Sequence, residues 1–126
     1  MKKIWIVDDD EEMSRAVSLM LKVLDCEAAA FLNARSAAQA LMAGRRPDAL
    51  LLDINMPEVT GLDLLEFLRR NQAWKRLPIV MLSSEAADVT VDKAMAIGAD
   101  GYLTKPVVIE ELETMLARVF QKYAKG

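Results

Sequence analysis

Polar side chains suited to phosphate and metal chemistry stand where short apolar runs of the sequence end. They are the acidic pair Asp8-Asp9, the lone carboxylate Asp53, the hydroxyl of Ser83 and the ammonium group of Lys105. If the apolar runs form parallel strands, their carboxyl ends meet at the edge of the sheet where open α/β proteins bind ligands. We therefore expect these five side chains to converge on one site.

These residue types favour a magnesium site at which a carboxylate attacks a phosphoryl group. Clustered carboxylates repel one another, and a hard divalent cation relieves that repulsion. Mg²⁺ prefers oxygen ligands, and a sequence with no histidine and one cysteine is a poor candidate for a zinc or copper site. A carboxylate can form an acyl phosphate while a metal, an ammonium group and a hydroxyl stabilise the transition state. Mg²⁺, Lys105 and Ser83 would fill these places around Asp53.

Asp53 ends an uninterrupted apolar run, residues 49–52. A run without polar alternation suits a strand that is buried on both faces, as in a parallel sheet. Pro47 and Pro57 flank the run too closely for a stable helix to form. We expect Asp53 to lie at the mouth of the sheet and to act as the oxygen nucleophile.

The rest of the chain alternates between predicted strands and predicted helices. Strands are expected over residues 3–7, 26–31, 49–53, 77–82 and 101–103. Helices are expected over residues 11–24, 34–43, 61–68, 88–97 and 109–123. The first helix carries apolar residues at helical spacing, namely Met13, Ala16, Val17, Met20, Leu21 and Leu24. Alternation with short connections predicts a single α/β domain with helices on both faces of a parallel sheet.

Polar residues precede three of these helices and are placed to cap them. Asp10 and Asn33 can each accept hydrogen bonds from the first turn that follows. Thr60 with Asp63 three positions later has the pattern of a capping box. Gly44 is expected to end the second helix.

Composition limits the class of protein. A length of 126 residues suits one domain, and a hydrophobic content of 53% excludes a disordered chain. The sequence has neither a signal-peptide pattern nor an apolar run long enough to span a membrane, so we expect a cytoplasmic location. The single cysteine, Cys26, cannot form an internal disulfide and is expected to be a small buried hydrophobe.

The charge pattern argues against a nucleic-acid-binding domain. The formal net charge is −3, which offers no general basic surface for phosphate backbones. The arginine pairs at 45–46 and 69–70 are expected to be solvated helix ends. We therefore expect neither nucleic acid nor a membrane among the partners.

Over essentially its whole length the sequence resembles a CheY-like response-regulator receiver domain. The matching motifs are Val-Asp-Asp at 7–9, Leu-Leu-Asp-Ile-Asn-Met-Pro at 51–57 with Gly61, Ser83 at a strand end, and Gly-Ala-Asp-Gly-Tyr-Leu-Thr-Lys-Pro at 98–106. Each motif is modest alone, but together their order and spacing are highly specific. The resemblance implies that residues 1–126 form a single receiver domain with a flavodoxin-like (βα)5 fold and strand order 2-1-3-4-5.

The resemblance also implies the roles of the polar residues. Asp53 would accept a phosphoryl group from a phosphohistidine on a partner sensor histidine kinase or phosphotransfer protein. Asp9, Asp53 and the carbonyl of Asn55 would bind Mg²⁺, and Asp8 would act mainly through a bound water. Lys105 would pair with the phosphoryl group, and the bond from Lys105 to the following proline would be cis.

A conformational switch is a further implication of the resemblance. Ser83 would move toward the phosphoryl oxygens, and Tyr102 would turn inward into the vacated space. The face made by the fourth helix, the fifth strand and the fifth helix would then change its preference for a downstream effector. Asn55 and Glu85 occupy the two positions that tune loss of the phosphoryl group, and their polar side chains predict a short-lived phosphorylated state.

Plainer interpretations stand beside these. Tyr102 can be an edge-packing residue, and the side chain of Asn55 can be a turn former. Two other functions are open: a phosphohydrolase with Asp53 as nucleophile, and a receiver fold that serves only as an interaction module. The first is disfavoured because Asn55 stands where such enzymes commonly carry an acidic general acid. The second is disfavoured because the acids, Ser83 and Lys105 are all present.

Overall fold

The computed structural model describes residues 1–56, 58–84 and 89–124. Five parallel strands form one sheet in the order β2-β1-β3-β4-β5, as the resemblance implies. The strands are β1 (Lys2–Val7), β2 (Cys26–Phe31), β3 (Ala49–Asp53), β4 (Ile79–Ser83) and β5 (Gly101–Thr104). Because the strand order reverses at β1, the carboxyl ends of β1 and β3 lie at the position where sheets of this kind bind ligands.

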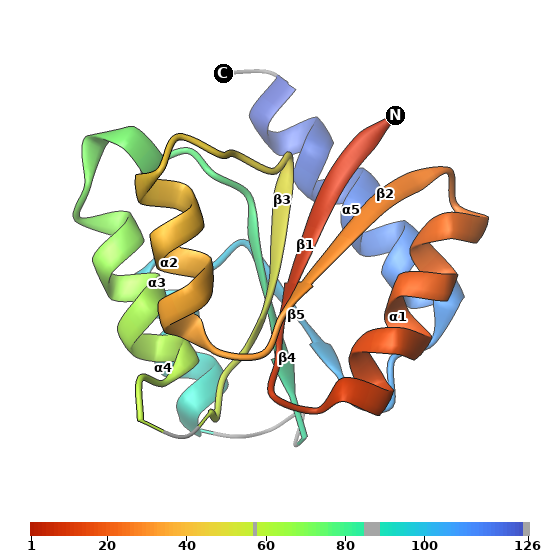
Figure 1. The fold of residues 1–126 in the computed structure, drawn as a ribbon, viewed down its shortest axis with the longest axis horizontal. Helices are drawn as coiled ribbons and strands as arrows, with labels where there is room; N and C mark the ends of the chain where they lie inside the picture. Colours follow the sequence, from red (N-terminus) through yellow and green to blue (C-terminus); the bar gives the residue numbers. More distant parts are fainter. Residues whose placement is uncertain (57, 85–88, 125–126) are drawn as a thin grey trace.

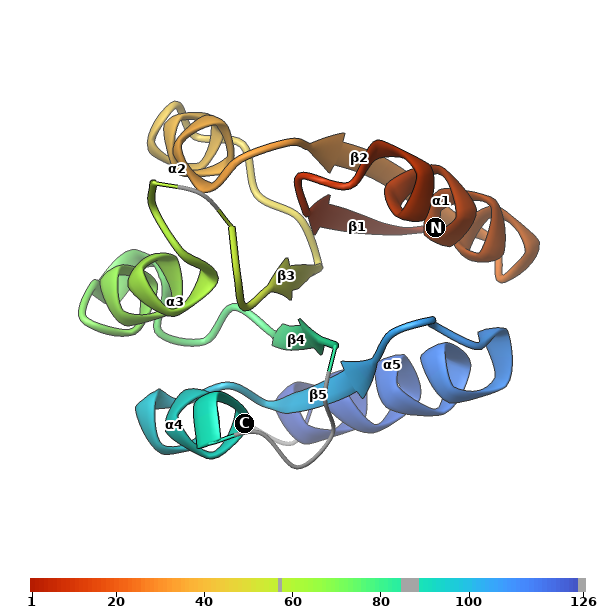
Figure 2. The same cartoon turned by 90° about the horizontal axis from the view of Figure 1, so that it is seen from below.

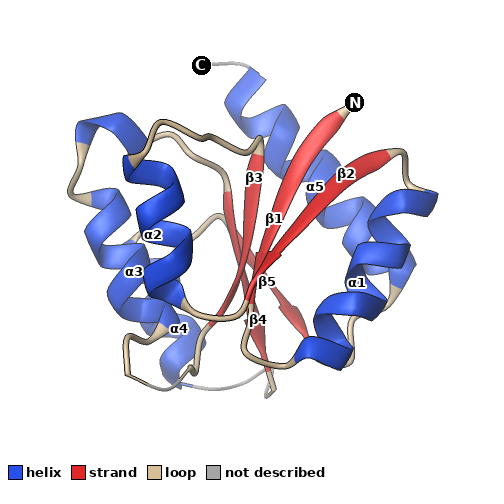
Figure 3. Cartoon of the chain, viewed as in Figure 1, coloured by secondary structure: helices blue, strands red, loops and turns tan. Residues whose placement is uncertain are grey.

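Helices cover both faces of the sheet (Figure 1). They are α1 (Glu11–Val23), α2 (Ala34–Met42), α3 (Gly61–Arg69), α4 (Val89–Ile97) and α5 (Ile109–Ala124), with a short 3-10 helix η1 (Gln72–Trp74). Helices α1 and α5 lie on one face, and α2, α3 and α4 lie on the other (Figure 2). The coloured cartoon in Figure 3 shows the resulting three layers. Among the described residues, no helix is both long and apolar enough to cross a membrane.

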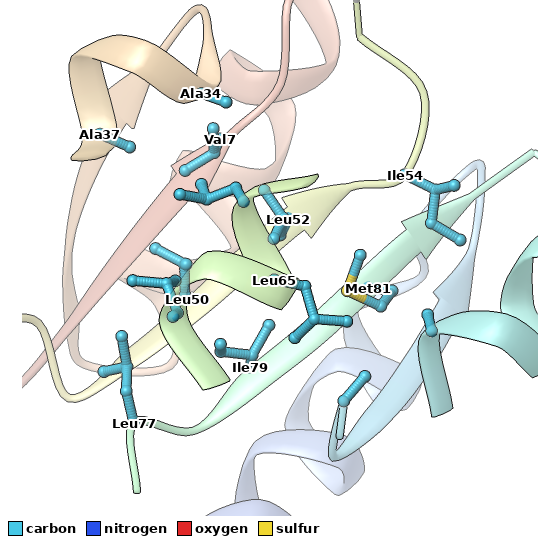
Figure 4. Packing of buried hydrophobic residues seen from close by; sticks show 14 of the residues in the cluster. Val7, Ala34, Ala37, Leu50, Leu52, Ile54, Leu65, Leu77, Ile79 and Met81 are labelled. Carbon is cyan, nitrogen blue, oxygen red and sulfur yellow. The ribbon is translucent and has the colours of Figure 1, made fainter. Parts of the chain in front are cut away.

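Strand β3 is buried along its whole length, as its apolar run predicts. Successive side chains of a strand point to opposite faces, so β3 contributes to two separate cores. Leu50 and Leu52 belong to the core under α2, α3 and α4, together with Leu65 of α3 (Figure 4). Ala49 and Leu51 belong to the core under α1 and α5. Asp53 is therefore held at the end of a strand that cannot shift without disturbing both cores.

The predicted caps are confirmed. Asp10 accepts a hydrogen bond from the N–H of Met13, and Asn33 accepts one from the N–H of Ser36. Thr60 and Asp63 form the expected capping box at the start of α3. The predicted elements are all present, with ends that differ by at most two residues. The expected start of the fourth helix, residue 88, lies outside the described residues.

Three details differ from the sequence-based expectations. Ala16 is exposed, and Ser14 is buried in its place, because α1 is rotated so that Ser14, Val17 and Leu21 face the sheet. The 3-10 helix η1 was not expected. Cys26 is only half-buried, because it lies at the start of the edge strand β2.

Arg69 is not a solvated helix end, so that expectation is wrong. Its side chain is 10% exposed and donates hydrogen bonds to four groups beyond its own helix. These are the carbonyls of Trp74, Leu77 and Gly98 and the carboxylate of Asp100, at distances of 2.8–3.1 Å. The guanidinium has several donors in a fixed fork, which suits it to join segments that are distant in the sequence. Arg70, by contrast, is exposed as expected.

Asp100 is the centre of this ionic network at the amino edge of the sheet. Its side chain is 1% exposed and accepts hydrogen bonds from the backbone N–H of Ile79, from Lys122 and from the hydroxyl of Tyr123. The network thus joins the end of α3 to the beginnings of β4 and β5 and to the last turn of α5. A buried carboxylate with this many donors is well compensated for its loss of water.

Replacing Asp100 with alanine is expected to lower the free energy of unfolding by about 3 kcal/mol, because it leaves the buried Arg69 without its counter-ion. The matched control is Glu66→Ala, which removes the exposed partner of Arg70 and is expected to cost less than about 1 kcal/mol. Urea denaturation followed by circular dichroism measures both values. Equal losses in the two variants would contradict a structural role for the network.

Candidate functional site

Four strands deliver polar residues to one edge of the sheet. Asp8 follows β1, Asp53 is the last residue of β3, Ser83 is the last residue of β4, and Lys105 follows β5. The strands are parallel and end at the lower edge of the sheet in Figure 1. Backbone hydrogen bonds continue the pairing past the strand ends, since the N–H of Lys105 donates to the carbonyl of Ser83 at 2.7 Å.

Lys105 joins two of the carboxylates. Its Nζ atom lies 2.8 Å from Oδ2 of Asp8 and 3.2 Å from Oδ1 of Asp53. Asp8 is fully buried, Asp53 is 5% exposed, and the lysine side chain is 20% exposed. The ammonium group therefore lies between the two buried acids and can contact a ligand that enters from solvent. The amine and the acids converge, as the sequence-based hypothesis required.

Backbone amides also help to orient the two carboxylates. The N–H of Asp10 donates to Oδ1 of Asp8 at 2.9 Å, while Oδ2 of Asp8 makes the ion pair with Lys105. The N–H of Asn55 donates to Oδ1 of Asp53 at 3.3 Å. Neither amide was singled out from the sequence, because backbone donors carry no residue-type signal.

The acids Asp8, Asp9 and Asp53 form a group that fits a divalent cation. One carboxylate oxygen from each lies within 4.8 Å of the others, and Asp9 faces solvent, which leaves a path for an ion. The donor set is entirely oxygen, which suits a hard ion such as Mg²⁺ rather than zinc or copper. Asn55 follows Asp53 by two residues at the mouth of the site, where its carbonyl is a further candidate ligand.

Burial and charge shift the titration of this group. Burial, followed by repulsion from Asp8, raises the pKa of Asp53 from 3.8 to about 6, although Lys105 opposes the shift. Burial lowers the pKa of Lys105, but its contacts with Asp8 and Asp53 outweigh that effect and leave the pKa raised. One ammonium group thus compensates three neighbouring carboxylates only in part, and the remaining negative charge favours a bound cation.

The structure places the other predicted residues as follows. Ser83 is buried at the end of β4, and Tyr102 lies on β5 and is 36% exposed. The Lys105-Pro106 peptide bond is cis, as implied by the resemblance. Glu85, the second predicted tuning position, lies outside the described residues.

The parallel sheet has this strand order, and three acids, a buried hydroxyl and a lysine lie at its carboxyl edge. Together these features define the receiver class of two-component signalling domains. The chain belongs to the response regulator receiver domain family, whose model matches residues 4–117.

Known proteins similar to this chain agree with the family. The chain is 32% identical over 120 residues to the chemotaxis protein CheY of Pseudomonas aeruginosa, covering 95% of this chain and 97% of that protein. It is 36% identical over 120 residues to the protein RcaC of Microchaete diplosiphon, covering 95% of this chain but only 18% of RcaC. The solved structure of the chemotaxis response regulator CheY4 of Vibrio cholerae matches with a TM-score of 0.84 and 33% identity, covering 94% of this chain and 98% of that one.

The raised pKa of Asp53 leads to a prediction about stability. The folded chain favours the protonated carboxyl, so ionised Asp53 destabilises the fold above about pH 6 and has no such effect below about pH 4. We expect Asp53→Asn to raise the free energy of unfolding by about 2 kcal/mol near neutral pH in the absence of divalent metal, with the gain fading as the pH falls from 6 to 4. Denaturation of both proteins across this pH range measures it. A gain that does not change with pH would contradict the assignment.

Proposed function

We propose that this receiver domain is a phosphoacceptor in which Asp53 takes a phosphoryl group from a phosphohistidine on a partner kinase or phosphotransfer protein. The observation that carries the proposal is the position of Lys105, whose Nζ contacts both Asp8 and Asp53. A lysine at this point is already placed for the charge that a phosphoryl group would bring to Asp53. Relatives of the family are response regulators, which supports a histidine kinase as donor.

Each residue then has a chemical role in the transfer. A carboxylate oxygen of Asp53 attacks phosphorus, and the bond from phosphorus to the donor imidazole breaks. Lys105 and the hydroxyl of Ser83 bind oxygens of the transferred group. Asp8, Asp9, Asp53 and the carbonyl of Asn55 would hold Mg²⁺, with Asp8 acting mainly through a bound water. Bound there, Mg²⁺ supplies positive charge to the phosphoryl oxygens and offsets the repulsion between the acids.

The proposed output is a change of binding preference on the face of α4, β5 and α5. In this proposal Ser83 moves toward the phosphoryl oxygens, and Tyr102 turns from its exposed position into the space that is left. The change is a population shift that new hydrogen bonds to the phosphoryl group would bias. The recipient would be a downstream effector protein or domain.

The acceptor role predicts a covalent product that depends on one residue. Incubation with acetyl phosphate and Mg²⁺ is expected to add one phosphoryl group to the parent and none to Asp53→Asn, because the amide is not a nucleophile. Intact-mass spectrometry measures the product, and omission of Mg²⁺ is the control. An unmodified parent would favour the interaction-module alternative, and steady-state release of phosphate from aryl phosphates would favour the phosphohydrolase.

The lifetime of the product tests the two tuning positions. Asn55 is exposed at the mouth of the site, where a polar side chain can assist the water that attacks the phosphoryl group. We expect Asn55→Leu and Glu85→Leu to slow the loss of phosphate about tenfold, which is less than the roughly 10²–10⁴-fold of a full general acid or base, because these side chains only orient the water. The decay of the phosphorylated mass after removal of the donor gives the rate. Unchanged decay in both variants would contradict the idea.

A further inference from the structure

The first turn of α3 packs directly against the peptide that follows Asp53. The N–H of Gly61 donates to the carbonyl of Ile54 at 3.0 Å. A Cβ atom built on Gly61 would lie 1.8 Å from the carbonyl oxygen of Asp53 and 2.7 Å from its carbonyl carbon. Gly61 does not have a positive φ, so this position needs the absence of a side chain and not a special backbone conformation.

The atoms that a side chain at position 61 would meet cannot move aside. They belong to the backbone at the end of β3, which is buried on both faces. Gly101 provides the contrast, because a Cβ there would meet Sδ of Met115 at 2.6 Å, and a methionine side chain can rotate away. A methyl group at position 61 would therefore force α3 away from β3, the strand that ends in Asp53.

The same connection between β3 and α3 carries Asn55. Its N–H donates to Oδ1 of Asp53, and its carbonyl is the candidate metal ligand. Further along, Glu58 has a φ of +66°, a left-handed conformation that a non-glycine residue adopts only when its surroundings enforce it. The contact at Gly61 and the capping box at Thr60 hold the far end of this connection, together with the packing of Val59 against the core.

We infer that Gly61 is a positioning residue for the acceptor site: its bare Cα lets α3 close on the Asp53–Ile54 peptide and so fixes the Asn55 backbone against the Asp53 carboxylate. The inference rests on the proposed function for its consequence in phosphoryl transfer. The contact itself does not depend on that function.

The first test compares Gly61→Ala with Gly101→Ala, the same substitution at a second buried glycine. Calorimetric titration with MgCl2 is expected to show affinity about tenfold lower for Gly61→Ala and unchanged for Gly101→Ala, which is the size of effect seen when supporting groups around a metal site are removed. Amide exchange of Asn55, measured by NMR without metal, is expected to be about tenfold faster in Gly61→Ala alone.

A second pair of variants covers the case in which Gly61→Ala does not fold. Thr60→Ala removes the cap that holds the same turn of α3, and Asn33→Ala removes the equivalent cap of α2. The two variants should lose similar stability, since each loses one capping side chain. Only Thr60→Ala is expected to weaken Mg²⁺ binding, by about threefold, and to speed exchange at Asn55.

The outcomes separate the inference from the proposed function. The role of Gly61 would be overturned if, in both pairs, the Mg²⁺ affinity and the Asn55 exchange rate matched those of the control variant, Gly101→Ala or Asn33→Ala. That conclusion holds whatever the parent does with acetyl phosphate. A parent that binds Mg²⁺ but is never phosphorylated would overturn the proposed function, while faster Asn55 exchange in Gly61→Ala would still support the positioning role.

Discussion

Repulsion among three carboxylates is the constraint on which the site depends. One carboxylate oxygen from each of Asp8, Asp9 and Asp53 lies within 4.8 Å of the others, and two of these residues are buried. Lys105 is the cation that contacts Asp8 and Asp53, and its single charge leaves the cluster negative. Burial and the neighbouring acid raise the pKa of Asp53 to about 6. The rest of the fold must supply the stability that holds these charges together.

The two edges of the sheet treat a buried aspartate in opposite ways. At the amino edge, Asp100 accepts hydrogen bonds from Arg69, Lys122, Tyr123 and the backbone of β4, so its charge is fully compensated. At the carboxyl edge, the partners of Asp53 among the described residues are the shared ammonium group of Lys105 and the backbone amide of Asn55. The first arrangement joins elements, and both oxygens of its carboxylate already accept hydrogen bonds from protein groups. The second leaves a buried acid whose ionised form is stabilised only in part by the protein.

Helix caps, which depend on neighbouring residues, could be predicted from the sequence, whereas the side-chain contacts of Arg69 with distant segments could not. The caps at Asp10, Asn33 and Thr60 depend on residues three positions apart, and all three are present. Arg69 has the sequence context of a solvated helix end. Its hydrogen-bond acceptors lie between residues 74 and 100, and only folding brings them close to its side chain. The burial of Ser14 in place of Ala16 likewise depends on how α1 rotates against the sheet.

The candidate site was predictable for a different reason. A parallel sheet brings every strand's carboxyl end to one edge, so the residue type at each strand end was enough to predict that Asp8, Asp53 and Lys105 converge. The residue types at the strand ends do not reveal which backbone groups orient these side chains. The amide of Asn55 has no residue-type signal, and the need for a glycine at position 61 appears only when α3 lies against the Asp53 peptide. A cluster of mutually repelling acids keeps its geometry only if such contacts hold the backbone, because the charges themselves favour separation.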